Sequence, residues 1–465
     1  MEFSNDFLRA GRRRALSGAI TFLLFVFLGA TSAWAQTVTT IFNFNGAKGS
    51  SPFLETLTQG RDGKLYGTTN TGGANNVGTV FRTDPSTGRE GVIHNFDGTN
   101  GSNPAGGLTL ANDGNYYGTT QYGGSAGLGV LYKITSAGTY TVLHQFLGGS
   151  DGSNPYGPPI AASDGSLYGT SSGGNTEAPA IYKLTRSGVY SVIYTYDKAT
   201  TGWLVYGLIQ GSDGLLYTMS NQGGTGNCGT IVKLTLSGQV KATLPFNCAN
   251  GGNPVLPLIQ ANDGNYYGTT FGGGTHNLGV IFKLTPSFAE KVLYEFASGT
   301  ATEPEAGLVQ GTDGNLYGVT TTGADGNSHL YRWNLSGGYS DLYTFTGVDY
   351  LVAPLLQHTN GRFYAPSWRF GTDNQGYIYS VDMKFGPFVT FVRSLGKIGS
   401  TAEILGQGFT GTTSVTFNAI AATSFRVVSD TYITVVVPAG ATTGPVVVTT
   451  PGGQLTSNKS FRVSQ

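Results

Sequence analysis

Asp263-Gly-Asn-Tyr-Tyr-Gly-Thr-Thr270 is the clearest copy of a phrase that returns seven times along the chain. Each copy starts with Asp or Asn before Gly and reaches a Tyr three residues after that Gly. The first Gly of each copy falls at 63, 114, 165, 214, 264, 314 and 361, so the steps are 51, 51, 49, 50, 50 and 47 residues. A period near fifty, built from short strands and turns, is typical of a β-propeller.

The second repeat shows how one unit is built. Residues 103–110, 115–120, 129–134 and 141–146 are short runs suited to strands, and the third alternates apolar and polar residues. Asn112-Asp113-Gly114 and Ser136-Ala-Gly138 supply turn residues, and Gly123-Gly124 opens a loop. Four antiparallel strands per repeat predict one propeller blade.

The two ends of the array predict how the ring closes. The seventh repeat supplies strands near 351–356, 362–366 and 376–381, but no fourth. Thr39-Thr-Ile-Phe-Asn-Phe44 matches the fourth strand of other repeats, such as Val292-Leu-Tyr-Glu-Phe296. We therefore expect an all-β, seven-bladed propeller in which the N-terminal strand completes the last blade and removes two open sheet edges. A solenoid of stacked β-units is the alternative, and it leaves the displaced strand unexplained.

The two cysteines of the chain, Cys228 and Cys248, flank one predicted hairpin with its turn at Ser237-Gly238. In a hairpin with this turn, the numbers of two residues that face each other add up to about 476, and 228 + 248 = 476. The two residues should therefore face each other within disulfide range. We predict a disulfide in the fourth repeat, because neither a His nor a second Cys pair lies beside them to make a metal site.

The first 35 residues have the pattern of a signal peptide. A run of three arginines from Arg12 precedes an apolar stretch over 18–29, and Ala33-Trp34-Ala35 offers a cleavage site that leaves Gln36 first. An uncleaved N-terminal anchor is the alternative. The mature protein is expected to be exported, to the extracellular space, the cell surface or the periplasm. No later segment is apolar enough to span a membrane.

Composition limits the partners. The chain has 26 Lys+Arg against 26 Asp+Glu, a formal net charge of zero. Nucleic-acid binding normally needs a basic face, so a nucleic-acid partner is not expected. The 73 Gly with 26 Tyr and 26 Phe indicate tight turns between aromatic strands rather than disorder.

The run from Asp263 to Phe296, which reads DGNYYGTT, then GG, LGVIFKLTP and VLYEF, resembles the bacterial GloVer tandem repeat. The resemblance covers roughly residues 38–383. It departs at Thr218-Met219 and Ala365-Pro366, which replace the usual Gly-Thr. The family has no established activity, and the resemblance implies an exported protein associated with the cell surface.

The fifty-residue period ends at Gly386. Short β-branched runs follow at 401–409, 414–417, 431–438 and 445–453, separated by Gly and Pro turns, and predict a small β-sandwich. Its details, above all Val437-Pro-Ala-Gly-Ala-Thr-Thr-Gly444, resemble the immunoglobulin-like IPT/TIG domain. The expected organisation is a signal peptide at 1–35, a propeller at 36–384 and an IPT/TIG-like sandwich at 385–465.

The motifs that usually carry chemistry are missing from the sequence. Each repeated Asp precedes Gly in a tight turn, where it stabilises the backbone, and the Tyr repeated once per unit suits blade packing. The five histidines show no metal-ligand spacing, and neither a nucleophile elbow nor a phosphate loop is present. We therefore predict no catalytic residue, no metal site and no cofactor. Carboxylates that converge from distant blades remain an alternative that sequence does not address.

The loops most variable among the repeats join the second strand to the third and one blade to the next. Both sets should lie on one face of the disc, and variable loops on a rigid scaffold often carry function. This face is expected to hold the candidate ligand-binding residues Tyr122, Tyr156, Trp203, Phe271, Tyr350, Trp368 and Phe370. Aromatic residues among uncharged polar loops suit sugar stacking or protein contacts. The alternative is that they fill the channel or cover blade edges.

These observations favour a non-enzymatic binding or scaffolding protein whose partner is extracellular polysaccharide or a surface protein. A secreted polysaccharide hydrolase or lyase with its site on the loop face is the rival hypothesis. A purely structural component of the envelope is the third. Fold analogy does not choose among them, because propellers host many functions.

Overall fold

The computed structural model describes residues 36–54, 56–173, 178–197, 201–298, 301–323, 325–346 and 351–464. The expected signal peptide at 1–35 lies outside these residues. Within the described part of the chain, seven four-stranded antiparallel sheets follow one another, and each is called a blade below.

The first four blades each contain four strands in chain order. Blade 1 consists of β2 (Thr58–Gln59), β3 (Leu65–Thr69), β4 (Thr79–Thr83) and β5 (Glu90–Asn95). Blade 2 consists of β6 (Thr109–Leu110), β7 (Tyr116–Thr120), β8 (Val130–Ile134) and β9 (Tyr140–Gln145). Blade 3 consists of β10 (Ile160–Ala161), β11 (Leu167–Ser171), β12 (Ala180–Leu184) and β13 (Tyr190–Thr195). Blade 4 consists of β14 (Trp203–Gln210), β15 (Leu216–Gln222), β16 (Thr230–Leu234) and β17 (Val240–Pro245).

The remaining blades complete the array. Blade 5 consists of β18 (Ile259–Gln260), β19 (Tyr266–Thr270), β20 (Val280–Leu284) and β21 (Glu290–Glu295). Blade 6 consists of β23 (Val309–Gln310), β24 (Leu316–Val319), β26 (Ser328–Trp333) and β27 (Tyr339–Phe345). Blade 7 consists of β28 (Leu356–Gln357), β29 (Phe363–Ser367), β30 (Tyr377–Asp382) and β1 (Thr37–Asn43). Short elements in the loops are η1 (Gly149–Asp151), η2 (Thr225–Asn227), β22 (Ala301–Thr302) and β25 (Thr322–Gly323).

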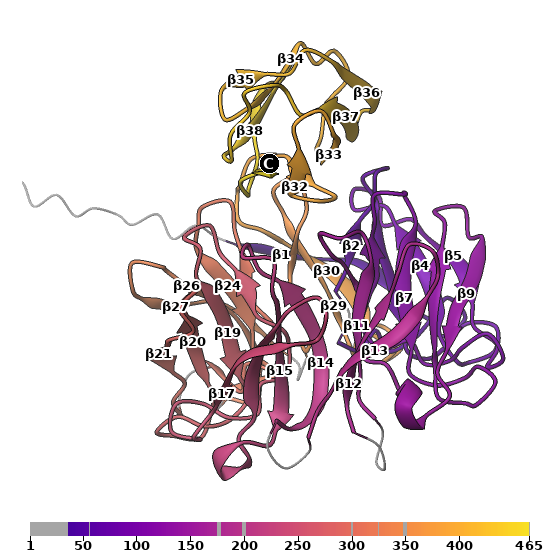
Figure 1. Ribbon diagram of the computed structural model, residues 1–465, viewed down its shortest axis with the longest axis vertical. Coiled ribbons are helices and arrows are strands. Elements are labelled where there is room, and N and C mark those ends of the chain that lie inside the picture. The colour runs from indigo at the N-terminus through magenta and orange to yellow at the C-terminus, as the bar shows by residue number, and fades with distance from the viewer. Residues whose placement is uncertain are drawn as a thin grey trace, which may run out of the picture. The chain divides into compact units, whose positions relative to one another are not determined.

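The N-terminal strand closes the ring, as the sequence predicted. Strand β1 pairs with β30 in antiparallel register, Thr37 opposite Asp382 and Asn43 opposite Tyr377. Figure 1 shows the indigo β1 beside the orange β30. The predicted first strands were too long, because β6 pairs only Thr109 and Leu110 with β7 where a strand over 103–110 was expected.

The repeated Asp and Tyr hold each turn together. Tyr117 Oη donates to Asp113 Oδ2 at 2.7 Å, and Gly114 between them has a φ of 80° that favours glycine. In blade 7, where Asn360 replaces Asp, the direction reverses and Asn360 Nδ2 donates to Tyr364 Oη at 2.9 Å. The repeated phrase therefore encodes a structural turn.

Aromatic contacts join each blade to the next. Phe96, which follows β5 of blade 1, meets Tyr132 of β8 in blade 2 edge to face, with ring centroids 5.4 Å apart. Phe44 after β1 meets Phe81 of β4 in the same way at 5.2 Å, which extends the pattern across the closure of the ring. A Cβ at Gly118 would collide with the Tyr132 ring, which explains the second Gly of the repeated phrase.

The C-terminal region forms two further four-stranded sheets. One contains β31 (Thr390–Phe391), β33 (Thr401–Leu405), β37 (Tyr432–Val436) and β36 (Phe425–Ser429). The other contains β35 (Ile420–Ala421), β34 (Ser414–Phe417), β38 (Val446–Thr450) and β39 (Gly453–Thr456). Strands β32 (Leu395–Lys397) and β40 (Arg462–Ser464) pair in parallel. Buried residues of both sheets, such as Ile433 and Val448, share one core, so the two sheets pack as a sandwich.

The sandwich contacts the face of the propeller that carries the Asp-Gly turns. Arg61 forms an ion pair with the largely buried Glu403 and lies over the ring of Tyr432. Thr431 Oγ1 donates to the carbonyl oxygen of Arg61 at 2.7 Å, and Gln407 Nε2 donates to Thr359 Oγ1 at 2.9 Å. The loop face, at the other end of the blades, therefore lies away from these contacts.

The disulfide between Cys228 and Cys248 is confirmed, with the Cα atoms 5.4 Å apart. The register used to predict it was wrong by one residue. Strand β16 pairs with β17 so that Ile231 faces Leu244, a sum of 475, and both cysteines lie in the loops beyond the strands. A disulfide is consistent with an oxidising compartment. Among the described residues, no helix is long and apolar enough to cross a membrane.

Candidate functional site

The first strands of all seven blades surround one cavity of about 510 Å³. Side chains alternate across a strand, so every second residue of the first strand and of the segment before it faces this cavity. The cavity is lined at one level by Thr58, Thr109, Ile160, Ile209, Ile259, Val309 and Leu356, one residue from each blade. A space bounded by every repeat is the central channel of a propeller.

An aromatic cluster lies at the loop-face end of this channel. Phe53 and Trp368 have ring centroids 4.7 Å apart, and Tyr156 meets Tyr206 at 4.8 Å. All four pack against a small core of Leu54, Leu256 and Val352. Phe53, Tyr156, Leu256 and Val352 precede the first strands of blades 1, 3, 5 and 7, Tyr206 lies within β14, and Trp368 follows β29 of blade 7. Because the other end of each first strand leads into the Asp-Gly turn, the cluster lies on the opposite side of the propeller from the sandwich. We call this cluster the channel mouth.

One carboxyl group accompanies the channel mouth. Burial, with a smaller effect of Glu303, raises the pKa of Glu305 to about 7. The Glu305 charge in turn acts on Tyr156 and Tyr206, whose pKa values are raised mainly by burial. A carboxyl that titrates near neutral pH can both donate and accept hydrogen bonds there.

The aromatic residues selected from the sequence lie in different parts of the fold. Tyr156 and Trp368 belong to the channel mouth, and Tyr122 is 46% exposed and lies within electrostatic reach of Tyr156. Phe370 packs against the core shared by the last two blades. Phe271 is half-buried, and its backbone N–H donates to the Asn253 carbonyl at 3.1 Å.

Two selected residues lie wholly or partly outside the described residues. Trp203 begins strand β14, but its side chain lies outside the described part of the structure, and so does the whole of Tyr350. The structure therefore brings together two of the seven predicted residues, Tyr156 and Trp368, with Tyr122 nearby.

Sequence analysis missed Phe53, Tyr206 and Glu305. A signal for Glu305 was present, because it stands eight residues before the turn residue Asp313. The same position in the other repeats holds only apolar residues or Tyr, namely Leu54, Ala105, Tyr156, Val205, Val255 and Val352. Repeats 2, 3 and 5 read Asn-Pro before this position, whereas the sixth reads Glu303-Pro304. An aligned comparison of the repeats would have exposed both acids.

Within the described ranges, no three His, Cys, Asp or Glu side chains gather as the ligands of a metal would. The channel mouth offers aromatic faces, two Tyr hydroxyls and one carboxyl to a ligand, and the Arg369 guanidinium lies over the Trp368 ring, 4.1 Å from its centroid. This combination suits an uncharged molecule with both apolar and hydroxylated faces.

Residues 30–205, 157–379 and 204–425 each match the family model of the Gloeobacter/Verrucomicrobia repeat. The chain belongs to this family. The matches overlap and together extend over residues 30–425, so the Gloeobacter/Verrucomicrobia repeat spans all seven blades and enters the C-terminal sheets. No curated protein matches the sequence.

Two solved structures support the propeller fold of this Gloeobacter/Verrucomicrobia repeat protein. A virginiamycin B lyase from Staphylococcus aureus is similar with a TM-score of 0.52 at 16% identity, over 74% of this chain and 99% of that one. An extracellular domain assigned to a hybrid two-component system of B. thetaiotaomicron is similar with a TM-score of 0.50 at 11% identity, over 92% of this chain and 58% of that one. At such identities the likeness shows the fold alone.

Proposed function

We propose that this protein is an exported, non-enzymatic binding and scaffolding protein that holds a carbohydrate chain at the channel mouth of a seven-bladed propeller. The observation that carries the proposal is the aromatic cluster of Phe53, Tyr156, Tyr206 and Trp368. Aromatic faces stack on the apolar face of a sugar ring, and a few polar groups at the edge of a pocket fix its orientation. The Tyr hydroxyls and the Glu305 carboxyl supply such groups.

The rival function is a polysaccharide hydrolase or lyase that uses Glu305 as its acid or base. A pKa of about 7 favours this reading, because a carboxyl that titrates near the working pH transfers protons efficiently. Glu303 would have to serve as the second carboxyl that most glycosidases need. We prefer binding, because catalytic groups are usually fixed by neighbouring hydrogen bonds, and among the described residues the Glu305 carboxyl has none.

Export and the C-terminal module belong to the same proposal. The leader at residues 1–35 would direct the chain out of the cytoplasm. The disulfide between Cys228 and Cys248 is stable in the oxidising environment outside it. The C-terminal sandwich would be an immunoglobulin-like module of the IPT/TIG type that acts as a spacer or as a contact for a surface protein. Extracellular polysaccharide is the expected partner of the propeller.

Co-sedimentation of the purified protein with a panel of insoluble polysaccharides tests the proposal. Wild type should sediment with at least one of them, and Trp368→Ala and Tyr206→Ala should remain in the supernatant. Tyr343→Ala is the matched control, because Tyr343 is 36% exposed on the outer strand of blade 6. Release of soluble sugar would favour the enzyme instead. Failure to bind any polysaccharide would leave a protein partner or a structural role.

A further inference from the structure

The walls of the central channel are largely apolar below the channel mouth. At the level of the first strands, blades 3 to 7 contribute Ile160, Ile209, Ile259, Val309 and Leu356, which are all half-buried and line the cavity. Pro257 and Pro354, which precede the first strands of blades 5 and 7, also line the cavity. A cavity of about 510 Å³ with such walls has the size and character of a small-molecule site.

One lysine from the C-terminal region enters this space. Lys459 follows strand β39 and lines both the channel and a cleft of about 730 Å³ between the turn face and the sandwich. Lys459 keeps an exposed side chain where it lines these spaces, and desolvation by the surrounding protein lowers its pKa. Among the described residues, its ammonium group has no ion pair or hydrogen bond. A partly desolvated amine without a counter-ion favours the approach of an anion.

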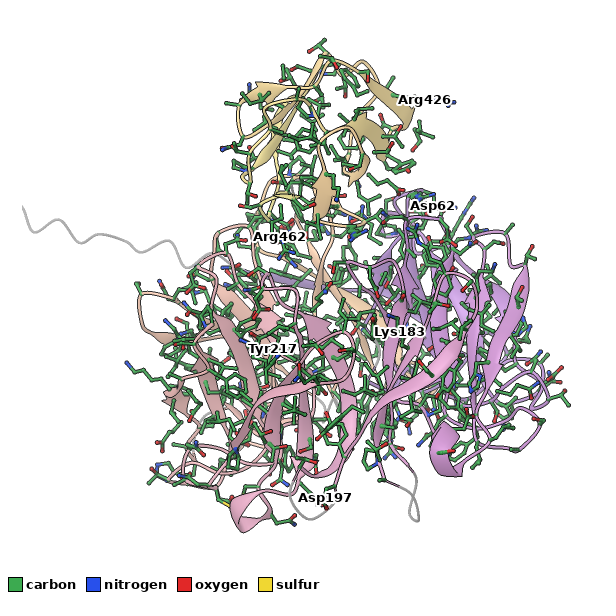
Figure 2. The ribbon with its side chains drawn as sticks, in the orientation of Figure 1. Asp62, Lys183, Asp197, Tyr217, Arg426 and Arg462 are labelled. Carbon is green, nitrogen blue, oxygen red and sulfur yellow. A yellow bond between two sulfur atoms is a disulfide. The ribbon has the colours of Figure 1, made fainter. Side chains whose placement is uncertain are left out.

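Two arginines place further positive charge in the cleft. Arg393 donates to the Ser163 carbonyl at 2.6 Å and Arg462 donates to the Ser212 carbonyl, so both guanidinium groups are held by backbone oxygens rather than by carboxylates. Arg393 also lies within the electrostatic reach of Arg186 and Arg462. Figure 2 shows Arg462 where the C-terminal strands meet the propeller.

Two of the acids nearest the cleft are paired with lysines, and a third, Asp263, accepts hydrogen bonds from Asn265 and Tyr267. Asp164, whose charge reaches Arg393, accepts from Lys183 Nζ at 2.9 Å. Asp213, on the next blade, pairs with Lys233 Nζ at 3.0 Å. The cleft therefore keeps an excess of positive charge at the entrance to an apolar channel, an arrangement that complements a molecule with a negative end and an apolar body.

The geometry points to a second binding site in which the channel holds the alkyl tail of a single-chain carboxylate, with its head group on Lys459 and beside Arg393 and Arg462. Strand residues rise about 3.3 Å each, so the lumen between Pro257 and Gln260 is about 10 Å long and fits an alkyl chain of about eight to ten carbons. A metal cation is disfavoured by the three positive charges. A neutral sugar would leave the Lys459 charge uncompensated.

Calorimetric titration of the purified protein with decanoate, below its micelle concentration, tests this site. Decanol and acetate are the comparison probes, since one lacks the charge and the other lacks the tail. We expect decanoate to bind more tightly than either probe. Lys459→Met keeps the length of the side chain and removes its charge, so decanoate should bind at least about tenfold more weakly while decanol is unaffected.

Two further variants separate the charge from the cavity. Ile209→Trp fills the lumen and should remove both decanoate and decanol binding. Lys241→Met is the matched control, because Lys241 lies exposed on strand β17 with Gln239 as its partner. Equal decanoate affinities for wild type and Lys459→Met would overturn the proposal, and so would the absence of decanoate binding to wild type at millimolar concentration.

Discussion

Gln59 and Thr359 are 300 residues apart in sequence and hold the first and last blades together. Gln59 Nε2 donates to Thr359 Oγ1 at 2.8 Å, and the Thr359 N–H donates to Gln59 Oε1 at 3.0 Å. Both residues are buried. At the same position in blades 4 to 7, a Gln side-chain oxygen accepts a hydrogen bond from a backbone N–H in the turn of the preceding blade. These residues are Gln210, Gln260, Gln310 and Gln357. Blades 2 and 3 carry Leu110 and Ala161 at this position.

Gln59→Leu should lower the free energy of unfolding by about 1–3 kcal/mol, because the buried Thr359 N–H loses its acceptor. Leucine fits the position in blade 2, so the loss reflects the hydrogen bonds rather than the shape of the side chain. Urea denaturation followed by circular dichroism gives the value. Gln239→Leu, at an exposed turn, serves as the control and should change stability by less than about 0.5 kcal/mol. Equal values for the two variants would contradict the role of the clasp.

Loss of the disulfide should destabilise the fourth blade. Cys228 and Cys248 close a loop with a sequence separation of 20, and replacing both with Ser should cost about 3 kcal/mol by restoring chain entropy to the unfolded state. Thermal denaturation with and without reductant measures the effect. Reductant should shift wild type to the midpoint of the double variant and leave that variant unchanged. A double variant as stable as oxidised wild type would show that the bridge is dispensable.

The contact between the sandwich and the propeller depends on Arg61 and Glu403. Burial raises the pKa of Glu403, and the adjacent Arg61 opposes that rise. Arg61→Met should therefore destabilise the protein by about 3 kcal/mol, because it leaves a buried carboxylate without its partner. The double variant Arg61→Met/Glu403→Met should recover most of that loss.

Chemical denaturation of the single and double variants measures this coupling. Lys384→Met breaks an exposed pair with Asp382 and should cost less than about 1 kcal/mol. A double variant that is no more stable than Arg61→Met would mean that Arg61 acts through packing on Tyr432 instead.

The repeats explain how much of this fold could be predicted from sequence. The Asp-Gly turn and its Tyr recur at one spacing, so the blades and the displaced strand β1 followed from local pattern alone. The contact of Arg61 with Glu403 did not, because it joins residues 342 apart and Glu403 lies outside the repeats. The first strands of blades 2 and 7 were overestimated, because only two residues of each pair with the second strand, whereas β14 of blade 4 extends over Trp203–Gln210.

The channel mouth was only partly predicted. Tyr156 and Trp368 were selected because aromatic residues in loops are conspicuous, and the same reasoning selected Phe370, which packs in a core. Phe53 and Tyr206 were overlooked because they adjoin apolar strands and look like core residues. Which aromatic residues meet at the mouth depends on how blades far apart in sequence converge on the axis, and no local pattern encodes that.

Glu305 should make stability depend on pH in a definite direction. Its folded pKa of about 7 is above the ordinary value of 4.5, so the folded state binds the proton more tightly. The contribution of Glu305 to stability is therefore fully present below pH 4.5 and is lost as the pH rises to 7. Glu305→Gln should match wild type at pH 4 and exceed it at pH 8 by about 1–3 kcal/mol.

Denaturation at both pH values gives these differences. Glu295→Gln is the comparison, because hydrogen bonds from Thr275 lower the pKa of Glu295 and its replacement should reduce stability at pH 8 instead. A Glu305→Gln variant with no advantage at pH 8 would contradict a buried, weakly acidic carboxyl at the channel mouth.

The most direct test of the central claim is calorimetric titration of wild type and Tyr206→Ala with a soluble oligosaccharide from the polysaccharide that sediments the protein. Chromatography of the sugar after each titration shows whether it was cleaved. Binding by the channel mouth predicts that the variant binds at least about tenfold more weakly and that the oligosaccharide is recovered intact. Unchanged affinity in Tyr206→Ala, or shortened sugar after incubation with wild type, would contradict a non-catalytic carbohydrate site at the channel mouth.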